Sequence, residues 1–187
     1  MINNLDIHDG DSKYYGGDQA WLKEVGVDDY YINRACAIIS CANFLVALSQ
    51  MPKFQTLDIK NDKKSYIELS NEILTYIKPT PFGIFTLGQL ERGFINYLNK
   101  RGIEVSSIKR KINSRYDLMD MNNIVRNGYP LLMLNWFHKN KNFDRHWITI
   151  TKIDEAGFIA SNWGEKRYYS HDELFSSKTP RWVITFV

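Results

Sequence analysis

Both cysteines of the chain lie in one apolar segment, INRACAIISCANFLVALS, and their positions in it differ in chemistry. Cys36 stands where a helix is expected to begin, and the unpaired amides and dipole of a helix N-terminus lower the pKa of a thiol. Cys41 lies inside the helix, where a small buried thiol is typical of a core. Five residues span about 7.5 Å along a helix, too far for a disulfide. Cys36 is therefore the candidate nucleophile, although its own segment fits a core residue equally well.

Among the four histidines, His146 has the setting expected of a general base. It opens the run HWITITKI, which has the pattern of a strand, directly after a polar loop. Its ring can therefore face a cleft while the strand holds it in place. In isolation, an ordinary imidazole at a strand end explains the residue as well. The other histidines are expected in a polar N-terminal segment, at a strand end and in a surface turn: His8, His138 and His171.

Asn162 stands at the end of the next expected strand, in GFIASNW. The tight turn DEAG predicts that residues 146–153 and 157–163 pair antiparallel, which places Asn162 beside His146. An amide there can hydrogen-bond the imidazole and fix its tautomer and orientation. Trp163, the next residue, would shield that bond from water. Read alone, Asn162 is a turn-forming residue, so the joint geometry is what favours a role in catalysis.

The elements that must position these residues fall into two parts. Helices are expected first, and from Pro130 onward short aromatic and β-branched runs predict strands. This order predicts an α+β fold, with an N-terminal helical part whose buried, cysteine-bearing helix packs on a C-terminal, largely antiparallel sheet. The expected helices cover residues 35–48, 64–77, 86–98 and 117–126, and the expected strands are LLMLNWFHK, HWITITKI, GFIASNW and RWVITFV.

Length and composition predict one domain over residues 1–187. The chain is 44% hydrophobic, which is enough apolar material for one sizeable core. Residues 1–13 are polar and are expected to form a loose N-terminal segment. Two cysteines suit a reducing compartment, and neither a signal peptide nor a membrane span is visible in the sequence. A cytoplasmic protein without a membrane partner is therefore expected.

Partners other than a protein find little support in the sequence. The 24 basic and 21 acidic residues leave a net charge of only +3. Residues 100–115 hold six of the basic residues and could contact phosphates, but they lack interleaved aromatics, so a solvated helix end and strand edge is the preferred interpretation. Neither CxxC nor HExxH occurs, and His8 with Asp9 and Asp11 fits a polar tail. We expect no nucleic acid, metal or cofactor.

A cysteine at the start of a buried helix, a histidine opening a strand as HW and an asparagine ending the next strand as NWG resemble papain-like cysteine peptidases. The chain order is also the same, and YYGGDQAW resembles a segment of the bacterial branch related to the peptidases that cut double-glycine leaders. The resemblance covers most of residues 14–175 and implies a papain-like fold. It also implies a thiol-dependent hydrolase that acts on a peptide or protein substrate without a cofactor.

The resemblance assigns roles to individual residues. Cys36 would attack a peptide or amide carbonyl, His146 would take and return the proton, and Asn162 would orient His146. Gln19 and the backbone amide of Cys36 would stabilise the oxyanion. Asn33 is the alternative amide for that role, because Gln19 lies seventeen positions before the cysteine and the family's glutamine usually lies only a few residues before it.

The sequence departs from the family beside the nucleophile. Ala35 and Ala37 flank Cys36 where the family usually has glycine. The two added methyl groups are expected to narrow the cleft beside the thiol. This departure favours an alternative function, in which a catalytically silent papain-like fold binds a peptide or protein partner in its cleft.

Overall fold

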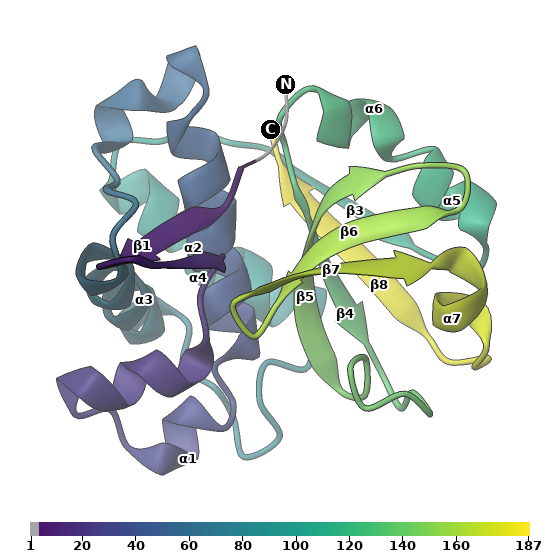
Figure 1. Cartoon of the computed structure of the whole chain (residues 1–187), viewed down its shortest axis with the longest axis horizontal. Helices are drawn as coiled ribbons and strands as arrows, with labels where there is room; N and C mark the ends of the chain where they lie inside the picture. The colour runs from purple at the N-terminus through teal and green to yellow at the C-terminus, as the bar shows by residue number, and fades with distance from the viewer. Residues whose placement is uncertain (1–3) are drawn as a thin grey trace.

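The computed structural model describes residues 4–187, with the backbone alone at positions 55 and 56. Helices occupy most of the chain up to residue 126, and strands most of the remainder (Figure 1). This order confirms the expected α+β class. The helical elements are the 3₁₀ helices η1 (Gln19–Val25) and η2 (Pro52–Leu57) and the α-helices α1 (Asp29–Ile32), α2 (Cys36–Ser49), α3 (Lys63–Tyr76), α4 (Leu87–Lys100), α5 (Arg115–Met119), α6 (Asn122–Arg126) and α7 (His171–Phe175).

The main sheet has six strands in the order β3-β8-β4-β5-β6-β7, and every neighbouring pair is antiparallel. The pairing predicted across the DEAG turn is therefore confirmed. A bulge between Ile150 and Lys152 shifts the register of that pair. The strands are β3 (Ser107–Lys111), β4 (Leu131–Asn135), β5 (His146–Ile153), β6 (Gly157–Asn162), β7 (Glu165–Ser170) and β8 (Arg181–Phe186).

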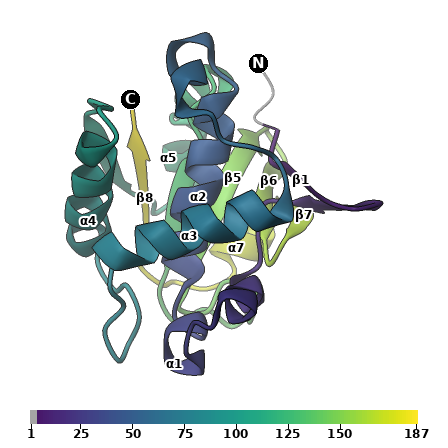
Figure 2. The same cartoon turned by 90° about the vertical axis from the view of Figure 1, so that its left-hand side faces the viewer.

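Helix α2 lies between the sheet and α3, and α4 lies to one side, in contact with α3 and with β8 (Figures 1 and 2). Phe44 in the middle of α2 makes edge-to-face contacts with Phe94 of α4, at 5.9 Å between ring centroids, and with Phe186 of β8, at 5.5 Å. Neighbours on all sides explain why α2 is apolar around nearly its whole circumference. The burial of Cys41, which has no exposed surface, is confirmed as expected.

The opposite face of the sheet has its own hydrophobic cluster. Alternate residues of β4 point to the two faces, with Leu132 in the cluster around α2 and Met133 in the second cluster. Short helices α5, α6 and α7 cover this second face through Leu118, Val125 and Leu174. Two layers of helix therefore enclose a central sheet.

Helix starts follow their capping residues closely. Asp62 caps α3, and the Thr86 hydroxyl accepts a hydrogen bond of 3.1 Å from the amide of Gln89 at the start of α4, as the capping pattern predicted. The single helix expected over residues 117–126 is wrong. Two short helices, α5 and α6, replace it, and the second begins at the paired asparagines Asn122 and Asn123, which are weak helix formers.

The expectation of a loose segment over residues 1–13 is also wrong for the part of it that the structure describes. Strands β1 (Asp6–Asp9) and β2 (Ser12–Tyr15) form an antiparallel hairpin, while positions 1–3 lie outside the described residues. Leu5 and Ile7 are fully buried in the main core and anchor the hairpin to it.

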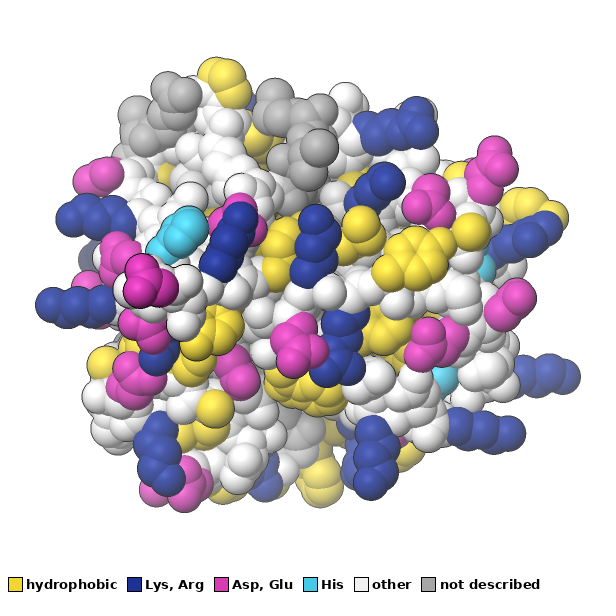
Figure 3. Space-filling model, viewed as in Figure 1, with side chains coloured by type: hydrophobic (Ala, Val, Ile, Leu, Met, Phe, Trp, Pro, Cys, Tyr) yellow, Lys and Arg dark blue, Asp and Glu magenta, His cyan; other side chains and the backbone are white. Residues whose placement is uncertain are grey.

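The surface carries both signs of charge. On the face shown in Figure 3, basic and acidic side chains are interspersed. Among residues 4–187, none of the helices combines the length and the apolar character needed to cross a membrane.

Candidate active site

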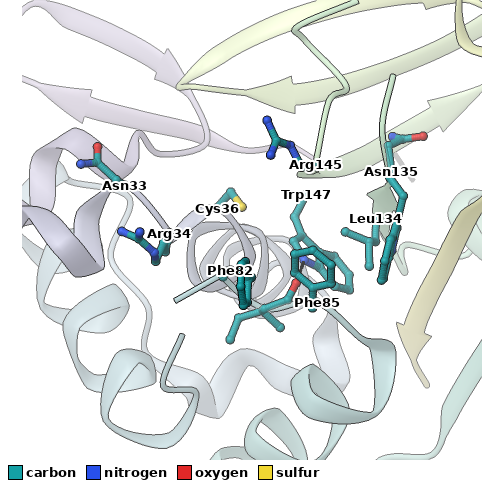
Figure 4. Close-up of a pocket in the computed structure, with 12 residues that line it drawn as sticks. Asn33, Arg34, Cys36, Phe82, Phe85, Leu134, Asn135, Arg145 and Trp147 are labelled. Atoms are coloured by element: carbon teal, nitrogen blue, oxygen red, sulfur yellow. Dashed lines mark hydrogen bonds between the residues drawn. The ribbon is translucent and has the colours of Figure 1, made fainter. Parts of the chain in front are cut away.

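Cys36 is the first residue of α2, as the sequence predicted, and it lies where two pockets meet. The smaller pocket, with an empty volume of about 240 Å³, is also lined by Gln19, His146 and Asn162. The larger pocket, of about 400 Å³, extends on the other side of the thiol between aromatic side chains. Figure 4 shows the sulfur at the end of the helix, facing this larger pocket. Cys36 thus lines both pockets while its side chain is partly buried.

His146 and Asn162 are joined by a hydrogen bond. The ring Nε2 lies 2.7 Å from Asn162 Oδ1, the contact expected from the strand pairing. Asn162 Nδ2 donates to the Tyr169 hydroxyl at 2.9 Å and to the Asn142 carbonyl at 3.3 Å, which fixes the orientation of the amide. Since the oxygen then faces the ring, Nε2 must carry the hydrogen, and the neutral ring has its lone pair on Nδ1. His146 is therefore held in the tautomer that can accept a proton at Nδ1.

Trp163 covers this pair. Its ring stacks on that of His146, with 4.8 Å between centroids and an interplanar angle of 26°. The residue adopts a left-handed backbone conformation, with φ at +50°, and so does Arg145, directly before His146, at +48°. Such conformations cost on the order of 1–3 kcal/mol for residues other than glycine. Backbone strain therefore flanks the hydrogen-bonded pair on both strands.

Gln19 reaches the smaller pocket although it lies far from Cys36 in sequence. It is the first residue of η1, which Asp18 caps. The preceding Gly17 packs so closely on Tyr66 that a Cβ there would lie 2.0 Å from the ring. Asn33, the alternative amide, is exposed and lines the larger pocket instead. Only Gln19 shares a pocket with His146.

Asn43 anchors the segment that carries Gln19, and sequence reasoning missed it. Its side-chain oxygen accepts from the Gly17 amide at 3.1 Å and from the Tyr66 hydroxyl at 2.7 Å. Its amide nitrogen donates to Ser161 at 3.1 Å and to Thr149 at 3.3 Å. A single asparagine in the middle of a largely apolar helix was the available signal, because a buried amide needs partners on neighbouring elements.

The charge state of the pair differs from the expectation for a helix N-terminus. Burial raises the pKa of the Cys36 thiol, and nearby backbone amides, that of Trp147 foremost, offset this only in part. Burial likewise lowers the pKa of His146 to about 4, although its bond to Asn162 opposes the shift. The predicted lowering of the thiol pKa is therefore wrong, because desolvation outweighs the helix end. Near neutral pH both groups are uncharged, and among residues 4–187 no hydrogen bond joins them.

The two alanines beside the nucleophile do not narrow the cleft. Ala35 and Ala37 are fully buried, belong to the main hydrophobic core and line neither pocket. Their methyl groups therefore point into the protein, and the expectation drawn from them is wrong. Cys41 differs from Cys36 as expected, because complete burial raises the pKa of its thiol well above the usual value.

Aromatic side chains form the wall of the larger pocket. Phe85 contacts Phe82 and Trp136, with centroids 6.0 and 4.5 Å away, and the Trp147 indole donates to the Ile84 carbonyl at 2.8 Å, which fixes the loop that carries the phenylalanines (Figure 4). An extended peptide could place an apolar side chain here while its carbonyl lies at the thiol. Within the described part of the chain no cluster of potential metal ligands occurs.

Comparisons with known proteins find a likeness among solved structures. No protein-family model matches the chain, and no curated protein matches its sequence. Among solved structures, it is similar to the peptidase domain of Streptococcus ComA, a bifunctional ABC transporter involved in a quorum-sensing pathway. The identity is 16%, the TM-score is 0.49, and the match covers 86% of this chain and 93% of that one.

Proposed function

We propose that the protein is a papain-like, thiol-dependent hydrolase of peptide or amide bonds, in which Cys36 is the nucleophile, His146 the general base and Asn162 the residue that orients His146. The observation that carries this proposal is the bond of 2.7 Å between His146 Nε2 and Asn162 Oδ1 beside a pocket that Cys36 also lines. The nucleophile comes from α2, and the base and its orienter come from the consecutive strands β5 and β6 much later in the chain. That convergence is the arrangement that acyl transfer by a thiol requires.

The reaction follows from the tautomer of His146. As Sγ of Cys36 attacks the carbonyl carbon, Nδ1 of His146 takes the thiol proton. The negative charge that develops on the carbonyl oxygen is stabilised by the backbone amide of Cys36 and the side chain of Gln19. When the tetrahedral intermediate collapses, the C–N bond breaks and the imidazolium gives its proton to the leaving amine. Water, deprotonated by His146, then hydrolyses the thioester.

Asn162 acts through His146. An uncharged amide oxygen keeps the hydrogen on Nε2 and therefore the lone pair on Nδ1, where the thiol proton must arrive. The amide of Asn162 stabilises the imidazolium less than a carboxylate would, which agrees with the lowered pKa of His146, about 4. Trp163, stacked on the ring, limits the access of water to this bond.

A second function is favoured by the charge state of the site. The raised pKa of Cys36 and the lowered pKa of His146 mean that no thiolate–imidazolium pair forms in the free protein near neutral pH. A catalytically silent fold that holds a peptide in its aromatic pocket would have the same properties. In the hydrolase, by contrast, the proton moves only during attack.

Incubation with an unbiased peptide library, followed by mass spectrometry of the products, separates the two functions. A hydrolase yields new peptide ends that accumulate with time and are absent with Cys36→Ala. Cys41→Ala is the matched control, because it removes a thiol from the same helix and should leave the product pattern unchanged. Identical products from the wild type and Cys36→Ala would contradict the proposal, and retention of peptides without cleavage would favour the binding module.

A further inference from the structure

A pocket separate from the candidate active site lies where α7 ends and β8 begins, at the right of Figure 1. It has an empty volume of about 610 Å³ and shares no lining residue with the two pockets beside Cys36. Its walls come from the end of β3, the end of α7 and the loop over residues 176–180. Part of this space is open to solvent, and the cavity volume itself, about 290 Å³, lies at the lower edge of the range of small-molecule sites, roughly 300–1,000 Å³.

The lining of this pocket is cationic. Lys111, Lys178 and Arg181 contribute positive charge, and no acidic residue lines it. In the part of the chain that the structure describes, none of the three forms an ion pair. The preceding residues of β3 differ, because Lys109 pairs with Glu91 and Arg110 with Asp120, at 2.8 and 2.7 Å. The three cations of this pocket therefore lack a carboxylate partner, although the Lys111 ammonium lies 5.9 Å from the centroid of the Trp182 ring.

Arg181 is the deepest of these groups, with 2% of its surface exposed. Its Nη2 donates to the carbonyls of Leu174 and Ser177 at the end of α7, and its guanidinium carbon lies 4.8 Å from the centre of the Phe175 ring. Through these contacts, the Nη2 end of the side chain caps the C-terminal end of α7. They leave Nε buried without a partner, and a buried charge without a counter-charge is costly.

Further polar atoms around Arg181 also lack partners. The hydroxyl of Thr179, which lines the pocket, is buried and unbonded. Asn135 lies directly across from Arg181 in the β4–β8 register, and neither end of its buried amide is bonded to a described residue, but it lines the larger pocket beside Cys36 and not this one. Native proteins have few such groups, so the unbonded Nε of Arg181 and hydroxyl of Thr179 at this pocket need an explanation.

We propose that this pocket binds a small anion that carries a phosphate group. Arginine matches the geometry of a phosphate, hydroxyl and ammonium groups donate to its remaining oxygens, and three cations without an acidic partner match a dianion better than a monocarboxylate. A bound phosphate would supply the counter-charge that Arg181 lacks and an acceptor for Thr179. The pocket is one local cluster of donors, which suits a small molecule and not an extended polyanion.

Calorimetric titration of the full chain at constant ionic strength tests the proposal, with inorganic phosphate, glycerol 3-phosphate and acetate as probes. Saturable binding of both phosphates, and none of acetate at the same concentrations, is expected. Tighter binding of the ester indicates that a phosphate monoester is the natural ligand, and equal binding indicates free phosphate. Absence of saturable phosphate binding, or equal binding of acetate, would overturn the proposal.

Variants locate the binding. Arg181→Lys keeps the charge but loses the planar donor pair, and it should weaken phosphate binding by about tenfold. Lys111→Gln and Thr179→Val should weaken it by about three- to fivefold, and they carry the test if the buried Arg181 variant fails to fold. Lys64→Gln, an exposed site on α3 with the same change of charge, is the matched control. Equal losses in Lys64→Gln and Lys111→Gln would show non-specific attraction and contradict the assignment.

Discussion

The pocket at His146 and the pocket at Arg181 lie on the same sheet but treat their buried polar groups in opposite ways. Around His146, the amides of Asn162 and Asn43 have protein partners on every side. In the Arg181 pocket, the buried Nε of Arg181 and the hydroxyl of Thr179 have none among the described residues. A catalytic base must be held rigidly before substrate arrives, whereas a binding site can leave donors for its ligand to satisfy. We therefore interpret the first as preorganised for chemistry and the second as completed by an anion.

The largest expected effect belongs to the nucleophile. Cys36→Ala should lower peptide hydrolysis by on the order of a thousandfold or more, because the attacking atom is removed. Cys41→Ala should keep turnover within about twofold, while loss of a small buried side chain destabilises the fold by about 1 kcal/mol. Product formation measured by mass spectrometry and urea unfolding check the two outcomes. Loss of activity in a folded Cys41→Ala protein would mean that the wrong cysteine was assigned.

Acid should destabilise the fold through His146. Its pKa is about 4 in the folded protein and near the ordinary 6.5 in the unfolded chain, so between these values only the unfolded chain binds the proton. Stability contributed by the neutral ring is therefore complete above pH 6.5 and is lost as pH falls toward 4, by up to about 3 kcal/mol.

Urea unfolding of the wild type and of His146→Gln is measured at several pH values. The contribution of His146 is the difference between the decreases in unfolding free energy that the two proteins show on acidification. His8→Gln, at an exposed position, is the control and should retain the full loss of the wild type. If acidification lowers the unfolding free energy of His146→Gln as much as that of the wild type, the result would contradict a buried neutral imidazole.

Asn162 should have an intermediate effect, on the histidine and not on the thiol. Asn162→Ala frees the ring and should lower turnover by about 10- to 100-fold, while Cys36 remains open to alkylation. Asn162→Asp should raise the pKa of His146, because a carboxylate stabilises the imidazolium, and so move the acid limb of the pH–rate profile upward. NMR titration of the ring checks the direction. An unchanged His146 pKa in Asn162→Asp would disprove the contact.

The smallest effects come from removing one hydroxyl in each pocket. Ser161 Oγ donates to the Tyr15 carbonyl at 2.7 Å and accepts from Asn43, so Ser161→Ala should cost about 1–2 kcal/mol of unfolding free energy. Thr179→Val removes a buried hydroxyl without a partner and should be neutral or slightly stabilising when no phosphate is added. Equal losses in the two variants would remove the contrast between the pockets.

Local signals explain how much of the site could be predicted from sequence. The start of α2 at Cys36 follows from the polar residues before an unbroken apolar run. The diagonal contact of His146 with Asn162 follows from a short turn and period-two pairing, which are also readable in the chain. The approach of Gln19 depends on Asn43, and hence on packing between η1, α2 and the sheet. The raised pKa of Cys36 reflects its burial, which spacing along the chain does not encode.

The same reasoning applies to the fold. The α+β order and most helix starts were visible as capping residues and hydrophobic periods. The N-terminal hairpin was not, because Leu5 and Ile7 become informative only when the surface that buries them is known. The pocket at Arg181 joins β3 to a loop about seventy residues later, so only the strand order β3-β8 brings its cations together.

The most direct test of the central claim is the rate at which peptidyl acyloxymethyl ketones label Cys36 in the wild type and in His146→Gln. These reagents, used as a panel with varied side chains, require the nucleophile and its base, whereas iodoacetamide reports the exposed thiol alone. We predict that His146→Gln slows ketone labelling by about 100-fold and iodoacetamide labelling by less than about threefold. Equal ketone rates in the two proteins, or no labelling of Cys36 by any member of the panel, would contradict a Cys36–His146 mechanism.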